Sequence, residues 1–374
     1  MPAGLDIHQA AEGRCTNGGL SGILRHILAG SQCHEYGGVM SAHRFGVRCA
    51  AVAAAATIAS LGFSTATQAA AFPVWGRVPA VVKTITVGDR PDGIAASPFT
   101  GEIYAANYGS NTVSVISPLT GTVTKTITVG SDPWWIAVSP VTGDVYVVNS
   151  EFTTLSGGDS VSVINGWTNT VIKTIPVGHI PAGVAVSPIT GDVYVTNSDN
   201  NSLSVISGWT NTVIATIPVA VNTAAVAVSP FTGEVYALGY DGGVSVVNGR
   251  TGRVIKTLAV GNGLCCVGIS PLTGQVYISS ADTNQVFILS GRTNDVTSTL
   301  TTGPGPAGIA FNPLTGTVYL AIAGDDEVAV LNGLTGQVIA AVDVGDNPDA
   351  AVYSPLTNCA YITNLNGNTV SVIG

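Results

Sequence analysis

The chain has 374 residues, of which only 9% are charged, and its formal net charge is −9. From Phe72 onward there are 19 acidic residues against 9 basic ones. Because phosphate binding needs clustered Lys and Arg, this balance argues against nucleic acid as a partner and favours cationic partners.

The first 71 residues lack the repeat that fills the rest of the chain, and they are typical of a targeting region. Basic residues follow Met40, then an apolar run from Ala50 to Phe63, then small residues up to Ala71. This order predicts a secretory signal peptide over residues 40–71, preceded by an over-extended or disordered N-terminus over residues 1–39. The alternative is an uncleaved membrane anchor, although the apolar run is shorter than the roughly 20 residues that a span needs. We therefore expect a secreted, extracellular or cell-envelope protein with no membrane span in its mature form.

A Pro-x-Thr-Gly turn, followed by a polar residue, Val or Ile, and Tyr, recurs with small variations seven times. The turns are spaced by 42, 48, 42, 41, 42 and 42 residues. Blades of a β-propeller, each with four strands, repeat every 40 to 45 residues or so. The spacing predicts an all-β fold, a seven-bladed β-propeller of four-stranded antiparallel blades over residues 72–374. The prolines that mark the repeat are Pro98, Pro140, Pro188, Pro230, Pro271, Pro313 and Pro355.

The third repeat shows how one blade is built. Alternation and turn residues predict strand a over 183–187, strand b over 192–197, strand c over 202–206 and strand d over 213–219. Six repeats have Gly in the a-to-b turn and the seventh has Asn358, which indicates a left-handed turn position because Gly and Asn adopt positive φ cheaply. The same reasoning applies to the c-to-d turns.

The two ends of the repeat array complement each other. The seventh repeat stops at Gly374 after strand c, whereas residues 79–88 precede the first strand a and match the strand d pattern of residues 169–178. We expect this N-terminal strand to complete the last blade and close the ring, which leaves no open sheet edge between the first and last blades.

Residues 194–197 read Tyr-Val-Thr-Asn, and close variants occur at 146–149 and 361–364. The chain resembles the YVTN family of β-propeller repeat proteins over residues 79–374, although the pattern weakens at Tyr236, Tyr277 and Tyr319. The resemblance implies a secreted or surface-associated seven-bladed propeller, and most such proteins have no assigned activity. Similar rings include lactonases and a lyase, so the fold permits enzymes.

The d-to-a and b-to-c loops of a blade emerge on one face, here called the top, and the a-to-b and c-to-d turns emerge on the other, the bottom. The bottom turns are repetitive, whereas the top loops vary, and variable loops on a rigid scaffold commonly carry function. Blades 7, 1 and 2 share an arc of acids and aromatic residues, and blade 2 also has the longest b-to-c loop, residues 151–159. We expect a binding site for a small polar or cationic ligand at this channel mouth, with Trp134 as a stacking surface. The predicted site comprises Asp89, Arg90, Asp92, Asp132, Trp134, Trp135, His179, Asp346 and Asp349.

The alternative is structural: Trp134 and Trp135 plug the channel while the aspartates cap turns. The adjacent pair Cys265 and Cys266 can close a vicinal disulfide in an oxidising compartment, or remain as two buried thiols.

Catalytic signatures are scarce after the predicted cleavage site. His179 is the only histidine there, and no Gly-x-Ser-x-Gly nucleophile signature occurs. We therefore expect a monomeric binding or scaffold module without catalysis or cofactor, whose partner is a small polar ligand or a protein or cell-envelope component. The alternatives are a lactonase-like hydrolase or lyase that uses top-face carboxylates and His179, with Ca²⁺ at Asp92 and Asp349 as a weak metal candidate, and a structural protein of the cell envelope.

Overall fold

The computed structural model describes residues 78–150, 159–220 and 222–374. The predicted N-terminus and signal peptide, and residues 151–158 of the long loop, lie outside the described residues. Within these ranges the chain has no helix long and apolar enough to cross a membrane.

In the described residues, twenty-eight strands form seven antiparallel sheets of four strands each, which are the blades. The innermost strands, a, are β2 (Pro91–Ala96), β6 (Pro133–Val138), β10 (Pro181–Val186), β14 (Thr223–Val228), β18 (Leu264–Ile269), β22 (Pro306–Phe311) and β26 (Pro348–Ser354). Strands b are β3 (Ile103–Asn107), β7 (Val145–Asn149), β11 (Val193–Asn197), β15 (Glu234–Gly239), β19 (Val276–Ser280), β23 (Thr317–Ile322) and β27 (Cys359–Asn364). Strands c are β4 (Thr112–Ser117), β8 (Ser160–Asn165), β12 (Ser202–Ser207), β16 (Gly243–Asn248), β20 (Gln285–Leu289), β24 (Glu327–Asn332) and β28 (Thr369–Ile373). The outer strands, d, are β5 (Thr122–Thr128), β9 (Thr170–Pro176), β13 (Thr212–Pro218), β17 (Arg253–Ala259), β21 (Val296–Thr301), β25 (Val338–Asp343) and, in blade 7, β1 (Val81–Thr86).

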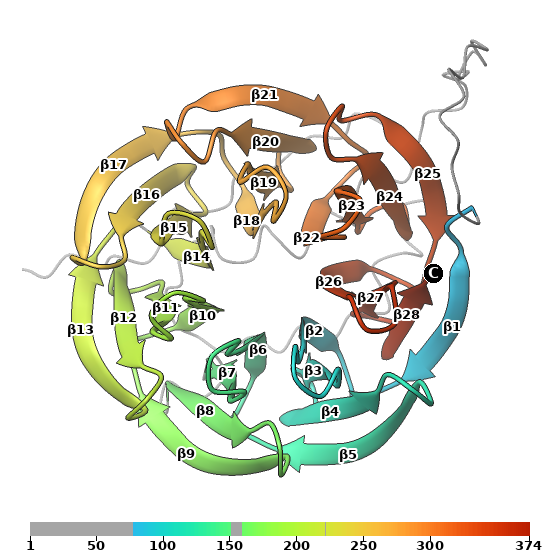
Figure 1. The fold of residues 1–374 in the computed structure, drawn as a ribbon, viewed down its shortest axis with the longest axis horizontal. Helices are drawn as coiled ribbons and strands as arrows, with labels where there is room; N and C mark the ends of the chain where they lie inside the picture. The colour runs from blue at the N-terminus through green and yellow to red at the C-terminus, as the bar shows by residue number, and fades with distance from the viewer. Residues whose placement is uncertain (1–77, 151–158, 221) are drawn as a thin grey trace, which may run out of the picture. The chain divides into compact units, whose positions relative to one another are not determined.

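The blades form a closed ring, as the sequence predicted (Figure 1). Each innermost strand contacts the innermost strands of both neighbouring blades, and β26 of blade 7 contacts β2 of blade 1. Strand β1 completes blade 7 by pairing antiparallel with β28, with Ile85 opposite Val370 and Thr84 opposite Ser371. The first and last parts of the repeat array are therefore joined by ladder hydrogen bonds.

Over the part of the chain that the structure describes, the core consists of seven apolar clusters that lie between neighbouring blades. Strand β11 is buried along its whole length, because the faces of its sheet are covered by the two adjacent blades. The outer strand β13 of the same blade is exposed except at Ile217. Burying one such side chain contributes about 1.5–3 kcal/mol, so the stability of the ring is distributed over many equivalent contacts.

The repeated Tyr and Asn residues have structural roles within and between blades. The hydroxyl of Tyr146 in blade 2 donates to Asn211 Oδ1 in the c-to-d turn of blade 3 at 2.8 Å. At the other end of the motif, the Asn197 side chain donates to the hydroxyls of Ser202 and Ser204 at 3.1 and 3.0 Å. The motif therefore joins neighbouring blades through its Tyr and the strands of one blade through its Asn.

The turn conformations also agree with the sequence prediction. Gly191 in an a-to-b turn has φ of 80°, and Asn358, which replaces Gly in blade 7, has φ of 53°. In the c-to-d turn of blade 3, Asn211 has φ of 53°. Both kinds of bottom turn therefore use a left-handed residue, which explains why only Gly and Asn occur there.

We expect the protein to unfold cooperatively above pH 10 because several tyrosines are buried between the blades. Burial, followed by the charge of Asp192, raises the pKa of Tyr194 to about 12, and burial likewise raises the pKa of Tyr353 to about 12. A raised folded-state pKa gives stability that is complete below the unfolded value of about 10 and is lost as the pH rises through the folded value. Tyrosinate absorbance and circular dichroism should therefore change together between about pH 10 and 12. Tyrosinate formation near pH 10 with an unchanged circular dichroism spectrum would contradict this.

Candidate functional site

The seven d-to-a loops of the top face share one backbone arrangement. The residue two positions after the glycine that follows strand d, or after Ala220 in the loop before blade 4, has a positive φ in every loop, between 50° and 68°. In most loops its N–H donates to a side chain in a b-to-c loop, as from Arg90 to Asn368 Oδ1 at 2.8 Å and from Asp132 to Asn111 Oδ1 at 2.9 Å. The left-handed residues are Arg90, Asp132, Ile180, Asn222, Gly263, Gly305 and Asn347.

Arg90 and Trp134 both contact one aromatic ring that the sequence analysis did not include. The guanidinium carbon of Arg90 is 5.3 Å from the ring centroid of Tyr108, a cation–π geometry. Trp134 packs edge-on against the same ring, with centroids 6.4 Å apart. Tyr108 follows β3 in the first b-to-c loop, and an aromatic residue in a variable top loop is the signal that could have identified it. These three residues form a half-buried aromatic and cationic cluster between blades 1 and 2.

Asp92 and Asp349 open the innermost strands of blades 1 and 7, as predicted, but Asp92 is only 3% exposed. Its carbonyl oxygen accepts a hydrogen bond from Thr363 Oγ1 of blade 7 at 2.8 Å. The next residue is Gly93, where an added Cβ would lie 2.8 Å from the carbonyl oxygen of Trp134. Glycine is therefore needed at this position because two innermost strands approach closely there.

Trp134 and Trp135 have different environments. Trp135 is half-buried and packs against two apolar clusters, the one between blades 7 and 1 and the one between blades 2 and 3. Trp134 instead contacts Tyr108 at the top face. Of the two, Trp134 is thus better placed for a ligand-stacking role.

His179 lies apart from these residues, between two carboxylates of the top loops. Its Nδ1 is 2.9 Å from Asp199 Oδ2, and its Nε2 is 3.8 Å from Asp159 Oδ2. Asp159 is 8% exposed and also accepts a hydrogen bond from the N–H of Ile180 at 3.2 Å. Ile180 has φ of 51°, an unfavourable conformation for a β-branched residue that costs on the order of 1–3 kcal/mol. The His179 loop is therefore a strained turn held by acidic side chains.

The remaining predicted residues lie in d-to-a loops and contact the b-to-c loop of the blade that follows them. Asp346 Oδ1 accepts a hydrogen bond from the Asn366 side chain at 3.2 Å. The carbonyl oxygen of Asp89 accepts from the N–H of Gly109 at 2.9 Å, and that of Asp132 accepts from the N–H of Ser150 at 3.2 Å. These contacts are of the turn-stabilising kind that the structural alternative describes, and they occur beside the Tyr108 cluster rather than in place of it.

Cys265 and Cys266 begin the innermost strand of blade 5 as free thiols. Cys265 Sγ lies 3.3 Å from both Ser279 Oγ and the carbonyl oxygen of Pro306. A hydrogen bond with Cys266 lowers the pKa of Cys265 and raises that of Cys266, which burial and the charges of Asp349 and Asp92 raise further. The vicinal disulfide stays a prediction.

Within the described ranges, no group of three or more His, Cys, Asp or Glu side chains is arranged to hold a metal ion. The Ca²⁺ candidate at Asp92 and Asp349 stays a prediction.

The two faces of the ring differ strongly in charge. Among the described residues, thirteen carboxylates lie in the top loops or at the top ends of strands, together with one cationic residue, Arg90, and His179. The other seven described Lys and Arg residues lie in the c-to-d turns or on outer strands that reach toward them. The top carboxylates are Asp89, Asp92, Asp132, Asp159, Asp199, Asp241, Asp282, Asp325, Asp326, Glu327, Asp343, Asp346 and Asp349.

The fold and this surface define a seven-bladed β-propeller with an acidic top face. No family model matches the chain, and no curated protein matches it. Among solved structures it is similar to the hydrazine synthase of Kuenenia stuttgartiensis, with 23% identity and a TM-score of 0.65, over 76% of this chain and 95% of that chain. At this identity the similarity establishes the propeller fold alone.

Proposed function

We propose that the protein is a binding or scaffold module that takes a cationic ligand, such as the basic groups of a peptide, on its top face. The observation that supports this most directly is the charge of that face, where thirteen described carboxylates accompany a single arginine. Propeller rings commonly bind partners through loops on one face, and a surface of one sign attracts ligands of the other.

The Tyr108 cluster gives the proposed site its specific contacts. Trp134 and Tyr108 offer aromatic surface at the top of blades 1 and 2. A guanidinium or ammonium group can lie over such rings, as Arg90 already does over Tyr108. Asp349 lies near the start of β26 in blade 7, which adjoins blade 1, and supplies negative charge at the innermost strands.

The test is binding of an oligo-arginine peptide, compared with its uncharged citrulline analogue, to the full chain. The arginine peptide should bind, and its affinity should fall with rising salt because exposed charges are screened beyond about 10 Å at 0.1 M. Substituting Trp134→Ala together with Asp349→Asn should weaken binding about tenfold or more, since each tenfold loss corresponds to only about 1.4 kcal/mol. Trp167→Ala in a bottom turn is the matched control and should leave the affinity unchanged. Equal binding of both peptides, or of the double variant and wild type, would exclude a cationic site here.

We also propose that the chain is a YVTN-type propeller that is secreted or attached to the cell surface. The repeat motif and the predicted signal peptide support this. Fractionation of a culture into medium, envelope and cytoplasm, with N-terminal sequencing of the product, tests it. A chain found in the cytoplasm with residues 50–71 retained would refute the proposal.

A lactonase-like hydrolysis is the second candidate function, and the position of His179 is the observation that favours it. A histidine between two carboxylates has the oriented ring that a general base needs. If the protein hydrolyses lactones, His179→Ala and Asp199→Asn should each lower turnover at least about 100-fold on a lactone panel. Asp282→Asn in another top loop is the control, and turnover equal in all three variants would remove this function.

A further inference from the structure

The bottom face carries an unusual number of exposed large apolar side chains. Each Pro-x-Thr-Gly turn has an apolar residue at its second position, and four c-to-d turns add Leu or Trp. Trp167 is 62% exposed, Trp209 is 69% exposed and Leu314 is 77% exposed. Among the described residues, every exposed large apolar side chain lies either in these turns or on the outer edge of the ring, and none lies in a top loop. The bottom set comprises Phe99, Leu119, Trp167, Ile189, Trp209, Phe231, Leu272, Leu314, Leu334 and Leu356.

These side chains are linked around the ring rather than scattered. The apolar residue of one a-to-b turn lies over the turn glycine of the next blade. Phe231 Cδ2 is 3.4 Å from the point where a Cβ on Gly274 would lie, and Leu272 Cδ2 is 3.0 Å from the corresponding point at Gly316. Phe99 of blade 1 also packs on Trp167 of blade 2, with ring centroids 5.7 Å apart. Because the seven turns are equivalent in the ring, the apolar side chains form one circular band, here called the bottom band.

The charged groups that are exposed beside the bottom band are mostly cationic. Arg250, Arg253 and Arg292 are exposed in or next to the c-to-d turns. This face has five described acids. Asp144 is buried, Asp192 is half-buried, and Glu102 and Glu234 are half-buried and accept hydrogen bonds from Tyr104 and Tyr236. Asp295 is exposed but paired with Lys256 at 2.6 Å. The bottom face thus combines apolar and aromatic side chains with positive charge, in contrast to the acidic top face.

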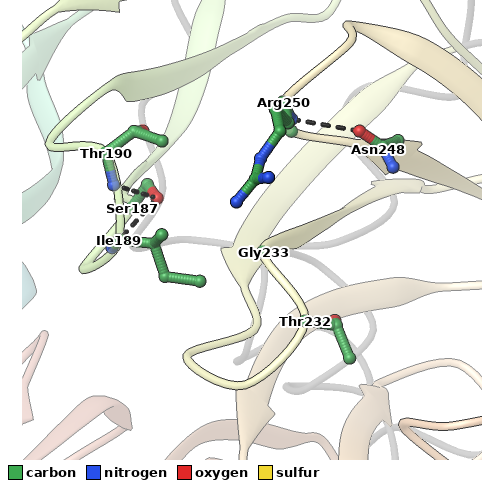
Figure 2. A pocket seen from close by; sticks show the side chains of 8 residues that line it. Ser187, Ile189, Thr190, Thr232, Gly233, Asn248 and Arg250 are labelled. Atoms are coloured by element: carbon green, nitrogen blue, oxygen red, sulfur yellow. Dashed lines mark hydrogen bonds between the residues drawn. The ribbon is translucent and has the colours of Figure 1, made fainter.

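One place in the bottom band opens into a cavity of about 340 Å³ between blades 3 and 4. At the c-to-d position where blades 2 and 3 have Trp, blade 4 has Arg250. In blade 3, Trp209 covers the turn glycine, Gly191: its Nε1 is 3.5 Å from the point where a Cβ on that glycine would lie. In blade 4, the turn glycine, Gly233, has only the Ile189 side chain near that point. Figure 2 shows the Arg250 side chain extending toward the space between Ile189 and Gly233. The replacement therefore puts a guanidinium, which suits a phosphate group, where the other two blades have an indole.

We infer that the bottom face docks peripherally on an anionic phospholipid surface. Exposed Trp, Leu and Phe can insert into the headgroup region while Arg and Lys contact lipid phosphates, the combination that places proteins at membrane interfaces. The charge asymmetry orients the ring, because an anionic surface attracts the bottom face and repels the acidic top face. A second copy of the chain fits less well, since face-to-face pairing would bring equivalent exposed arginines together.

The test is co-sedimentation of the full chain with vesicles of phosphatidylcholine alone or mixed with phosphatidylglycerol. Wild type should bind the mixed vesicles more tightly than the neutral ones, and less tightly as salt rises. Trp167→Ala with Trp209→Ala should reduce binding about tenfold or more, and Arg250→Gln with Arg253→Gln and Arg292→Gln should remove the preference for anionic vesicles. The matched controls are Ile172→Ala with Ile214→Ala on the outer strands, where both residues are similarly exposed, and Arg90→Gln on the top face.

Residues 1–77 are the same in all these proteins, so any vesicle binding that they provide would persist in every variant. Equal binding by wild type and the double Trp variant therefore overturns the inference, as does equal weakening by the outer-strand control. Absence of vesicle binding by wild type at low salt also overturns the inference. If ultracentrifugation then shows a dimer that the Trp substitutions dissociate, the bottom face binds a second copy of the chain instead of lipid. Unchanged thermal unfolding of the variants shows that a loss of binding is not a loss of fold.

Discussion

Deletion of residues 72–88 is expected to leave the protein unable to form a soluble ring. The deletion removes strand β1, whose ladder with β28 completes blade 7 and whose Ile85, 4% exposed, belongs to the cluster between blades 7 and 1. It also removes the contact between Lys83 Nζ and the carbonyl oxygen of Thr120 in blade 1, at 2.7 Å. Strand β28 would then present unpaired N–H and C=O groups, which promote aggregation. Size-exclusion chromatography and circular dichroism of the refolded deletion variant measure this.

Two point substitutions in β1 test whether ring closure depends on the buried contacts of this strand, without removing residues from the chain. Ile85→Asp places an unpaired carboxylate in the cluster between blades and should destabilise the protein by about 3–5 kcal/mol. Val82→Asp lies in the same strand at a position that is 57% exposed, so its effect should stay within about 0.5 kcal/mol. A soluble deletion variant with the wild-type melting temperature would show that the ring does not depend on β1.

Replacing the last residue of the repeat motif, Asn197→Asp, is expected to destabilise the protein by about 3–5 kcal/mol at pH 7. Asn197 is fully buried, and its amide nitrogen donates to the hydroxyls of Ser202 and Ser204. Its Oδ1 is also buried and has no hydrogen-bond partner among the described residues. A carboxylate cannot donate to either serine, and it places a negative charge at a fully buried position.

The loss should shrink as the pH falls. Burial raises the folded-state pKa of the introduced carboxyl above its unfolded value of about 4, so the folded protein prefers the neutral acid. The stability difference from wild type is then largest above the folded pKa and decreases as the pH falls toward about 4. Urea unfolding of both proteins at pH 7 and pH 5 measures it. Asn200→Asp, an exposed change three residues further on, is the control, and equal effects of the two substitutions would contradict the structural role of the motif.

Much of the fold could be predicted because each repeat carries the local sequence features that define the strands and turns of one blade. The spacing of the turns, the Gly or Asn at positive φ and the alternating strands are local properties, and strand b of blade 3 was predicted over 192–197 and observed over Val193–Asn197. The strand at the N-terminus could be assigned to blade 7 for the same reason, since residues 79–88 carry a strand d pattern that had no strand c before it.

The candidate site was only partly predictable. The sequence located Trp134 and Arg90 in top loops, but it did not identify Tyr108 as the ring that both contact. It grouped His179 with the arc of blades 7, 1 and 2. One contact of His179, Asp159, lies in the b-to-c loop of blade 2, and the other, Asp199, lies in blade 3 and was not among the predicted site residues. Such contacts join different loops, and loop spacing along the chain does not determine which side chains meet.

By itself, the sequence determined the number of blades, their strand order and the conformation of their turns, because all of these follow from interactions within about 40 residues of chain. Only the tertiary structure decided how the surface is divided. Closing the ring brings the d-to-a and b-to-c loops of all seven blades to one face and the Pro-x-Thr-Gly turns to the other. Residues that are 42 positions apart in the sequence thereby become neighbours, so single acids add up to an acidic top face and single apolar residues add up to the bottom band.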